Sequence, residues 1–203
     1  VNKTSVANVP YGTELSNNGN TLNVAGTTVI ATPSANTAQH TYVFNSWRNG
    51  SATVTGNLTV TANFTRTVNK YTVTIEVSPS GYGSVNKASV ANVLYGTVIR
   101  NSGNTLNVAG TIVTATPTAA DVQYTYAFTS WTNGSAEVTG NLTVTANFTR
   151  TTNTYTVTWK NWDGSVLETD TNVAYGTTPS FDKADPTKTA DAQYTYTFAG
   201  WDK

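Results

Sequence analysis

The stretch QYTYAFTSWTNGSAEVTGNLTVTANFTR, from Gln123 to Arg150, decides the fold. Its first half alternates aromatic residues with small or polar ones, and its second half alternates apolar residues with threonine and asparagine. Such period-2 alternation is typical of half-buried antiparallel strands, and Asn133-Gly134 between the halves predicts a turn. The residues predicted to share the buried face are Tyr124, Tyr126, Phe128 and Trp131, followed by Leu142, Val144, Ala146 and Phe148.

The first half of this stretch occurs three times in the chain, and the second half occurs twice. A copy of the whole stretch appears earlier from Gln39 to Arg66, and its first half returns from Gln193 to Trp201. Over the longer range, Val1–Thr67 aligns with Val85–Thr151 at a constant offset of 84 residues. About three-quarters of those positions are identical, which identifies a tandem array of one small β-module.

We therefore divide the chain into three repeat modules with short links. Residues 1–67 form module 1, which lacks its first strand, and residues 68–151 form the complete module 2. Residues 152–203 form a variant module 3, which lacks its final strand. The links Thr67–Lys70 and Thr151–Thr154 are about four residues long, which favours a semi-rigid, elongated rod over freely jointed beads.

The two incomplete modules leave two interpretations open. In the first, the chain is a piece of a longer array. In the second, the end modules lend strands to neighbouring chains and build a head-to-tail filament, because unpaired strand edges invite such pairing.

Composition narrows the class of protein. Charged residues make up only 11% of the chain, its net charge is zero, and its 22 aromatic residues suffice for a folded core. Threonine is roughly a fifth of the chain, and this composition favours an all-β fold. Balanced charge provides no field for nucleic acid or an anionic membrane, and no long apolar run predicts membrane insertion. Cysteine is absent, which excludes disulfides and thiolate catalysis. A cysteine-free, threonine-rich β-protein fits the outside of a bacterial or archaeal cell, so we expect an extracellular, surface or secreted location.

The order of signals resembles a known family. The segments that carry the resemblance are Tyr71-Thr-Val-Thr, Ser78-Pro-Ser-Gly-Tyr-Gly-Ser-Val85, Tyr95-Gly-Thr97, Val113-Thr-Ala-Thr-Pro117 and Leu142-Thr-Val-Thr-Ala-Asn-Phe148. Together they resemble the divergent internalin B-repeat, and residues 155–203 are similar to the related Listeria–Bacteroides repeat. The resemblance implies β-grasp-like modules strung in tandem in bacterial and archaeal surface proteins, as stalks, spacers or adhesive segments. It implies no enzymatic activity and no cofactor.

Catalytic and metal sites are not indicated by the residues themselves. His40 is the lone histidine, and the later copies place Tyr124 and Tyr194 at its position, so we interpret it as a half-buried aromatic site. Acidic residues mostly stand singly at turns or on outward strand positions, without the facing pair that a glycosidase needs. Asp182, Asp185 and Asp191 lack the spacing of a calcium loop, so we expect a solvated polar loop.

Asparagine sequons are frequent. The candidate glycosylation sites are Asn49, Asn57, Asn63, Asn133, Asn141 and Asn147. Asn63 and Asn147 are opposite in phase to the phenylalanines that follow them, so we expect both to face outward, where a glycan can attach.

Tryptophans form the other candidate set. Trp47, Trp131 and Trp201 recur at one position of the repeat, which favours a core role in a small module. Trp159 and Trp162 occur only in the third module, and they are the candidate ligand contacts.

These observations predict a non-enzymatic, extracellular structural or adhesive segment that acts as a stalk or spacer. One alternative is the subunit of an extracellular filament joined through the incomplete end modules. Another is a carbohydrate- or receptor-binding module. The expected partners are copies of itself or adjacent repeats of a longer chain, together with surface glycans or a host receptor.

Overall fold

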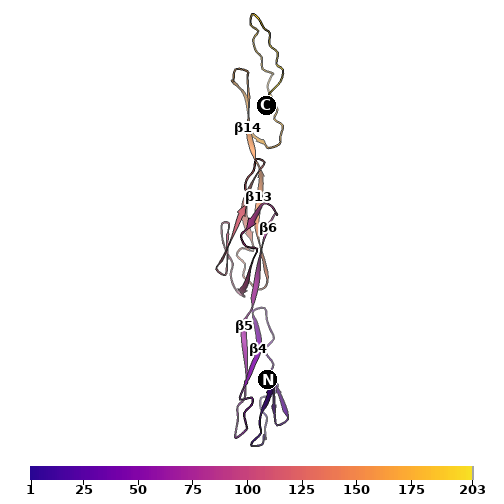
Figure 1. Cartoon of the computed structure of the whole chain (residues 1–203), viewed down its shortest axis with the longest axis vertical. Helices are drawn as coiled ribbons and strands as arrows, with labels where there is room; N and C mark the ends of the chain where they lie inside the picture. The colour runs from indigo at the N-terminus through magenta and orange to yellow at the C-terminus, as the bar shows by residue number, and fades with distance from the viewer. Residues whose placement is uncertain (203) are drawn as a thin grey trace. The chain divides into compact units, whose positions relative to one another are not determined.

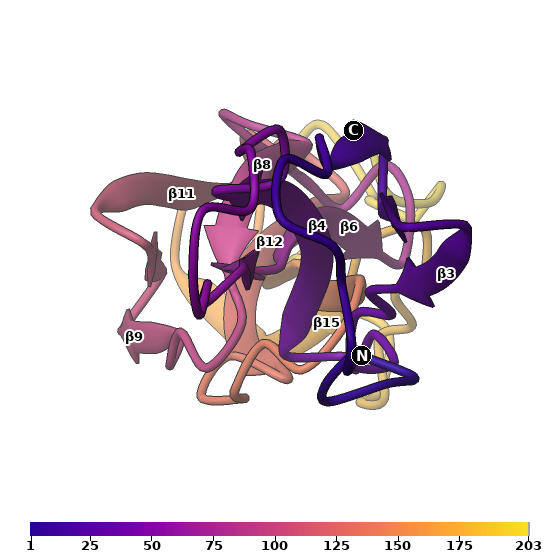
Figure 2. The ribbon, with the colours of Figure 1, turned by 90° about the horizontal axis from the view of Figure 1, so that it is seen from below.

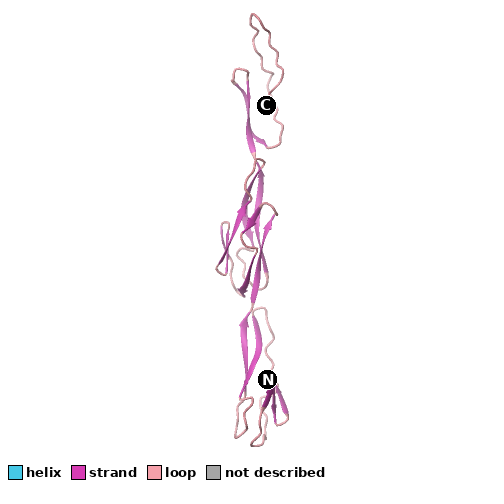
Figure 3. Ribbon diagram, viewed as in Figure 1, coloured by secondary structure: helices cyan, strands magenta, loops and turns pink. Residues whose placement is uncertain are grey.

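The computed structural model describes residues 1–202, and within this range every regular element is a β-strand (Figure 3). This confirms the all-β prediction. The first repeat contains β1 (Ser16–Asn18), β2 (Thr21–Val24), β3 (Thr27–Ile30), β4 (His40–Arg48) and β5 (Thr61–Val68). The second contains β6 (Lys70–Ser78), β7 (Gly83–Val85), β8 (Ser89–Leu94), β9 (Arg100–Ser102), β10 (Thr105–Val108), β11 (Thr111–Pro117), β12 (Tyr124–Thr132) and β13 (Leu142–Thr152). The third contains β14 (Thr154–Lys160) and β15 (Val166–Ala174).

Several small antiparallel sheets result. In the first repeat the strands are ordered β1-β2-β3 and β4-β5, and β4 and β5 lie side by side (Figure 1). In the second repeat the orders are β7-β11-β10-β9 and β12-β13-β6-β8, with β9 and β11 labelled in Figure 2. The third repeat has the pair β14-β15.

The β2–β3 hairpin of the first repeat and the β10–β11 hairpin of the second repeat have the same register. Leu22 pairs with Val29 in the first copy, as Leu106 pairs with Val113 in the second. The β2–β3 and β10–β11 hairpins each turn through an alanine and a glycine with positive φ, as type I′ turns require. The same hairpin is therefore built at the same place in both repeats.

The chain divides into two compact units. Unit 1 comprises residues 1–76, 85–115 and 130–146, and unit 2 comprises residues 77–84, residues 116–129 and the chain from 147 onward. The three-module division remains a prediction from the sequence.

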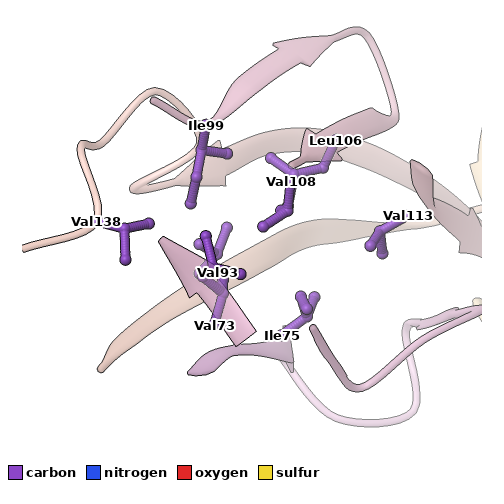
Figure 4. Close-up of a cluster of buried hydrophobic side chains, with 9 residues drawn as sticks. Val73, Ile75, Val93, Ile99, Leu106, Val108, Val113 and Val138 are labelled. Carbon is purple, nitrogen blue, oxygen red and sulfur yellow. The ribbon is translucent and has the colours of Figure 1, made fainter. Parts of the chain in front are cut away.

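The main core of unit 1 lies in the second repeat (Figure 4). Val73 and Ile75 of β6 are buried in it, and the residues that follow each of them, Thr74 and Glu76, are exposed. Trp131 packs against the edge of this cluster. The buried members are Val73, Ile75, Val93, Ile99, Leu106, Val108, Val113, Val138 and Val144.

The first repeat builds a smaller core from the same positions of the motif. Leu15, Leu22, Val24 and Val29 are buried, and Trp47 packs against them. The recurring tryptophan thus has a core role in both copies, as expected.

Aromatic side chains of unit 2 contact one another in pairs. Phe128 and Phe148 meet edge to face with ring centroids 5.6 Å apart. Tyr82 meets Tyr126 at 5.5 Å in the same manner. The Arg150 guanidinium lies 3.9 Å above the Tyr124 ring, where the negative face of the ring attracts the cation.

The third repeat forms fewer strands than the first two repeats, although its sequence is related to theirs. The turn at Asp163-Gly164 joins β14 to β15, and Gly164 has a positive φ. Residues 179–192 form a loop and not a helix, which leaves the polar-loop interpretation standing. Residues 193–201 repeat the text of β12 but form no strand in the described structure, because no neighbouring strand supplies the hydrogen-bond ladder.

Candidate functional sites at the repeat junctions and in the third repeat

Asn69 is the centre of a hydrogen-bond network at the junction between the first and second repeats. Its side-chain Nδ2 donates to the carbonyl oxygens of Thr37 and Ala38, at 2.9 Å and 3.0 Å. Its Oδ1 accepts a bond of 2.6 Å from the Thr41 hydroxyl. The amide side chain therefore uses both of its N–H donors and its acceptor.

The backbone of Asn69 is bonded as well. Its N–H donates to the Gln39 carbonyl, and its carbonyl accepts from the N–H of Tyr95, both at 2.9 Å. Tyr71, two residues later, donates its hydroxyl to the Ala38 carbonyl at 2.6 Å. One half-buried residue thus joins the base of the β4–β5 hairpin to the first strand of the next repeat.

Asn153 repeats this network 84 residues later, at the start of the third repeat. The Asn153 side chain donates from Nδ2 to the Asp121 carbonyl at 2.7 Å, and its Oδ1 accepts from the Thr125 hydroxyl at 2.7 Å. Its backbone N–H donates to the Gln123 carbonyl, and its carbonyl accepts from the Tyr175 N–H, both at 2.9 Å. The Tyr155 hydroxyl donates to the Val122 carbonyl at 2.5 Å. The two junctions are alike although the threonine and alanine of one become aspartate and valine in the other.

Sequence reasoning treated residues 67–70 and 151–154 as linkers and missed both asparagines. The signal was present, because Asn69 and Asn153 each stand two residues before the tyrosine that opens a repeat. Their partners lie about thirty residues upstream, and the bonds use main-chain carbonyls whose side chains differ.

The third repeat places its two unique tryptophans differently. Trp162 is 66% exposed, whereas Trp159 is half-buried. The Trp159 Nε1 donates to Asp170 Oδ2 at 2.8 Å, and its ring contacts Phe181 and Trp201 at centroid distances of 5.6 Å and 4.9 Å. Of the two candidate ligand contacts, Trp162 is the more exposed.

A surface cavity of about 690 Å³ lies beside Trp162. Lys188 stands between two aromatic rings there, with its Nζ 4.1 Å from the Trp162 centroid and 4.0 Å from the Tyr196 centroid. Phe198 and Lys160 also line the cavity, so both aromatic and cationic side chains border it.

The candidate glycosylation sites lie mostly on the surface. Asn49, Asn57, Asn63, Asn133 and Asn141 are exposed, and Asn147 is half-buried. Asn49 and Asn133 stand at positive φ, and each donates its side-chain amide to a carbonyl at 2.9 Å. Asn57 and Asn63 are therefore the more accessible amides of the first repeat.

Two acidic residues of the third repeat, Asp163 and Asp191, accept hydrogen bonds from residues close to them in the sequence. Asp163 accepts from the Ser165 hydroxyl and N–H, and these bonds lower the pKa of Asp163 below its usual 3.8. Asp191 accepts from Tyr196 Oη at 2.7 Å and from the N–H groups of Gln193 and Tyr194 at 2.8 Å.

Asp182 and Asp185 do not join Asp191 in a ligand cluster, and among the described residues no group of three metal-ligating side chains occurs. His40 is half-buried with its ring 5.9 Å from that of Tyr42.

We expect Asp191 to titrate below pH 3.8. The Tyr196 hydroxyl bond, followed by the two N–H bonds, lowers the Asp191 pKa, and the carboxylate raises the Tyr196 pKa above 10.0. Because the folded pKa is lowered, the turn is stabilised at neutral pH, and this stabilisation is lost as the pH falls through the folded value. A carboxyl-carbon NMR titration measures it directly. Tyr196→Phe should raise the midpoint toward 3.8, while Tyr194→Phe should leave it unchanged.

Comparison with protein-family models, curated proteins and solved structures found no match. Among the residues that the structure describes, no helix has the length and apolar character to cross a membrane.

Proposed function

We propose that the chain is a non-enzymatic, extracellular structural segment that acts as a stalk or spacer, built as a tandem rod of β-grasp-like modules. The observation that carries the proposal is the recurrence of one junction network at Asn69 and Asn153. A spacer needs joints that resist bending, and a joint with its donors and acceptors satisfied resists bending better than a solvated linker. The surface location and β-grasp topology rest on the resemblance to internalin B-type repeats.

The joint is tested by Asn69→Ala together with Asn153→Ala. Each substitution removes the bonds of one amide side chain, and we expect each to lower the unfolding free energy by about 1–2 kcal/mol. Small-angle X-ray scattering of the double variant should show a smaller radius of gyration and a broader distribution of distances. Asn63→Ala is the matched control, since Asn63 is exposed and its one side-chain contact is 3.3 Å long. Identical scattering from the double variant and the parent chain would refute the stiff-joint proposal.

A second candidate function is carbohydrate binding at Trp162. The favouring observation is an exposed indole at the rim of a cavity that Tyr196 and Phe198 also line, because aromatic faces stack well on sugar rings. A glycan array probed with the chain and with Trp162→Ala tests it. Binding that the variant loses, and that Trp159→Phe retains, supports a sugar site. If the parent chain binds no glycan on the array, the carbohydrate-binding function is refuted.

A further inference from the structure

Three Asn-Gly dipeptides stand in the chain at Asn18-Gly19, Asn49-Gly50 and Asn133-Gly134. At such a dipeptide the backbone nitrogen of the glycine can attack the Cγ of the asparagine side chain, because glycine has no Cβ to block the approach. Each of the three lies at or beside a turn. The surroundings of each dipeptide therefore decide whether this reaction occurs in the folded chain.

Two of the three dipeptides are held away from this reaction. Asn49 Nδ2 donates to the Thr59 carbonyl at 2.9 Å, and Asn133 Nδ2 donates to the Thr143 carbonyl at the same distance. Both asparagines have positive φ, and the glycine that follows each of them is buried. The side-chain amide has to leave its hydrogen bond, and the backbone has to leave a packed turn, before a ring can close.

Asn18 has none of these restraints. Its side chain and the N–H of Gly19 make no hydrogen bond within the part of the chain that the structure describes. Both residues are exposed, and no atom lies within 4 Å of the position that a Cβ on Gly19 would take. Asn18 also ends the edge strand β1, where it pairs with Thr21 across a two-residue loop. The exposed end of an edge strand opens at a lower free energy than the core, so the two reacting groups can meet.

The second repeat has the same turn without the amide. Ser102 stands at the offset of 84 from Asn18 and pairs with Thr105 in the register that Asn18 has in its own hairpin. The glycines that follow have φ values of 55° and 54°, and β9 is an edge strand as β1 is. The turn therefore forms equally well with serine, and the amide at position 18 is not needed for the fold.

We propose that Asn18-Gly19 is a self-modification site, at which the Asn18 amide is converted to a carboxylate without an enzyme. The Gly19 nitrogen forms a bond to Asn18 Cγ, and the bond from Cγ to Nδ2 breaks. Ammonia leaves with the proton of the Gly19 N–H, and a five-membered imide ring remains. One water molecule then opens the ring. Cleavage between Gly19 N and Cγ gives aspartate, whereas cleavage between Gly19 N and the Asn18 backbone carbonyl carbon gives isoaspartate.

Both products change the tip of the β1–β2 hairpin. Each places a carboxylate where Asn18 had a neutral amide, so the net charge of the chain falls by one from zero. Isoaspartate also adds one carbon to the main chain beside a two-residue loop, and loop length fixes the register of a hairpin. The next pair of the ladder joins Asn17 to Leu22, which is 3% exposed in the core of the first repeat. The modification therefore loosens the first repeat and leaves the second unchanged. It goes beyond the spacer function and does not depend on it, since it follows from one turn.

Peptide mapping by mass spectrometry tests the site on the parent chain. The protein is kept in warm, mildly alkaline buffer, once folded and once unfolded in urea. In the folded chain Asn18 should be converted to aspartate and isoaspartate, and Asn49 and Asn133 should react at least about tenfold more slowly, because their hydrogen bonds have to break first. In urea all three should react at similar rates. Conversion of Asn49 or Asn133 as fast as Asn18 in the folded chain overturns the inference, as does a folded chain in which Asn18 stays intact.

Two substitutions at the equivalent turns provide a gain and a loss. Ser102→Asn builds the same dipeptide in the second repeat, so this position should be converted at a rate close to that of Asn18. Asn18→Ser copies the turn of the second repeat and is the matched control, in which no conversion of this turn is expected. If the folded Ser102→Asn variant stays unconverted at that turn, the turn does not account for the reaction and the inference is overturned. A product that contains aspartate without isoaspartate overturns the imide route.

Discussion

Phe148→Ala should lower the free energy of local unfolding around β13 by about 3–5 kcal/mol. The Phe148 side chain is only 4% exposed, and its ring meets Phe128 edge to face at 5.6 Å. It also presses on Gly83, where an added Cβ would lie 2.4 Å from the ring. Removing the ring therefore opens a large apolar void that the glycine backbone cannot fill. Native-state hydrogen exchange of the β13 amides measures the change, because it reports unfolding of this segment without requiring one global transition.

The first repeat contains its own control for this substitution. Phe64 stands at the same position of the motif and meets Phe44 at 5.8 Å in the same edge-to-face geometry, yet it is 43% exposed. Phe64→Ala should cost much less than Phe148→Ala, since less area is removed from the core. Equal losses at the two positions would show that exposure does not decide the contribution of this phenylalanine.

The contrast between these two phenylalanines marks the limit of the sequence argument. Alternation along residues 123–150 correctly predicted two strands and the inward face of Leu142, Val144 and Phe148. It predicted the same for the first copy, because the text is nearly the same. Burial there also depends on a strand from elsewhere in the fold, and a pattern within one segment carries no information about its neighbour.

The copy of the repeat at residues 193–201 also differs from what its sequence predicts, because it forms no strand. Its text repeats that of β12, but a strand exists only where a ladder partner lies beside it. Trp201 keeps an aromatic environment even so, with its ring 4.7 Å from Phe181, and is 37% exposed. Side-chain character was thus predictable from the repeat, while strand formation was not.

The candidate sites were also predicted only in part from the sequence. That one of Trp159 and Trp162 would be exposed followed from their absence in the other repeats, but the sequence did not show which. The hydrogen bond from Trp159 to Asp170 decides it, and it forms across the β14–β15 hairpin between residues eleven apart. The junction asparagines escaped notice because their partners are carbonyl oxygens, which every residue possesses.

Gly134→Ala should lower the unfolding free energy of the second repeat by about 2–3 kcal/mol. Gly134 is buried in the turn that follows β12, and an added Cβ would lie 2.5 Å from the Trp131 Cβ and 2.9 Å from Asn101 Nδ2. The Trp131 Cβ is fixed to the backbone and cannot swing away, so the strand or the turn has to shift. That shift also loosens the 2.9 Å bond from Asn101 Nδ2 to the Gly134 carbonyl. Urea denaturation followed by tryptophan fluorescence measures the loss.

Gly140→Ala is the matched control, because no atom lies within 4 Å of the position that its Cβ would take. It should leave stability nearly unchanged or raise it slightly by restricting the unfolded chain. Gly50 has the same close approach to Trp47 in the first repeat, at 2.5 Å, so Gly50→Ala should also be destabilising. A glycine that recurs at one position of both copies is therefore required by contact with the tryptophan, and not by turn geometry alone. A loss from Gly140→Ala as large as that from Gly134→Ala would contradict this explanation and assign the effect to backbone flexibility.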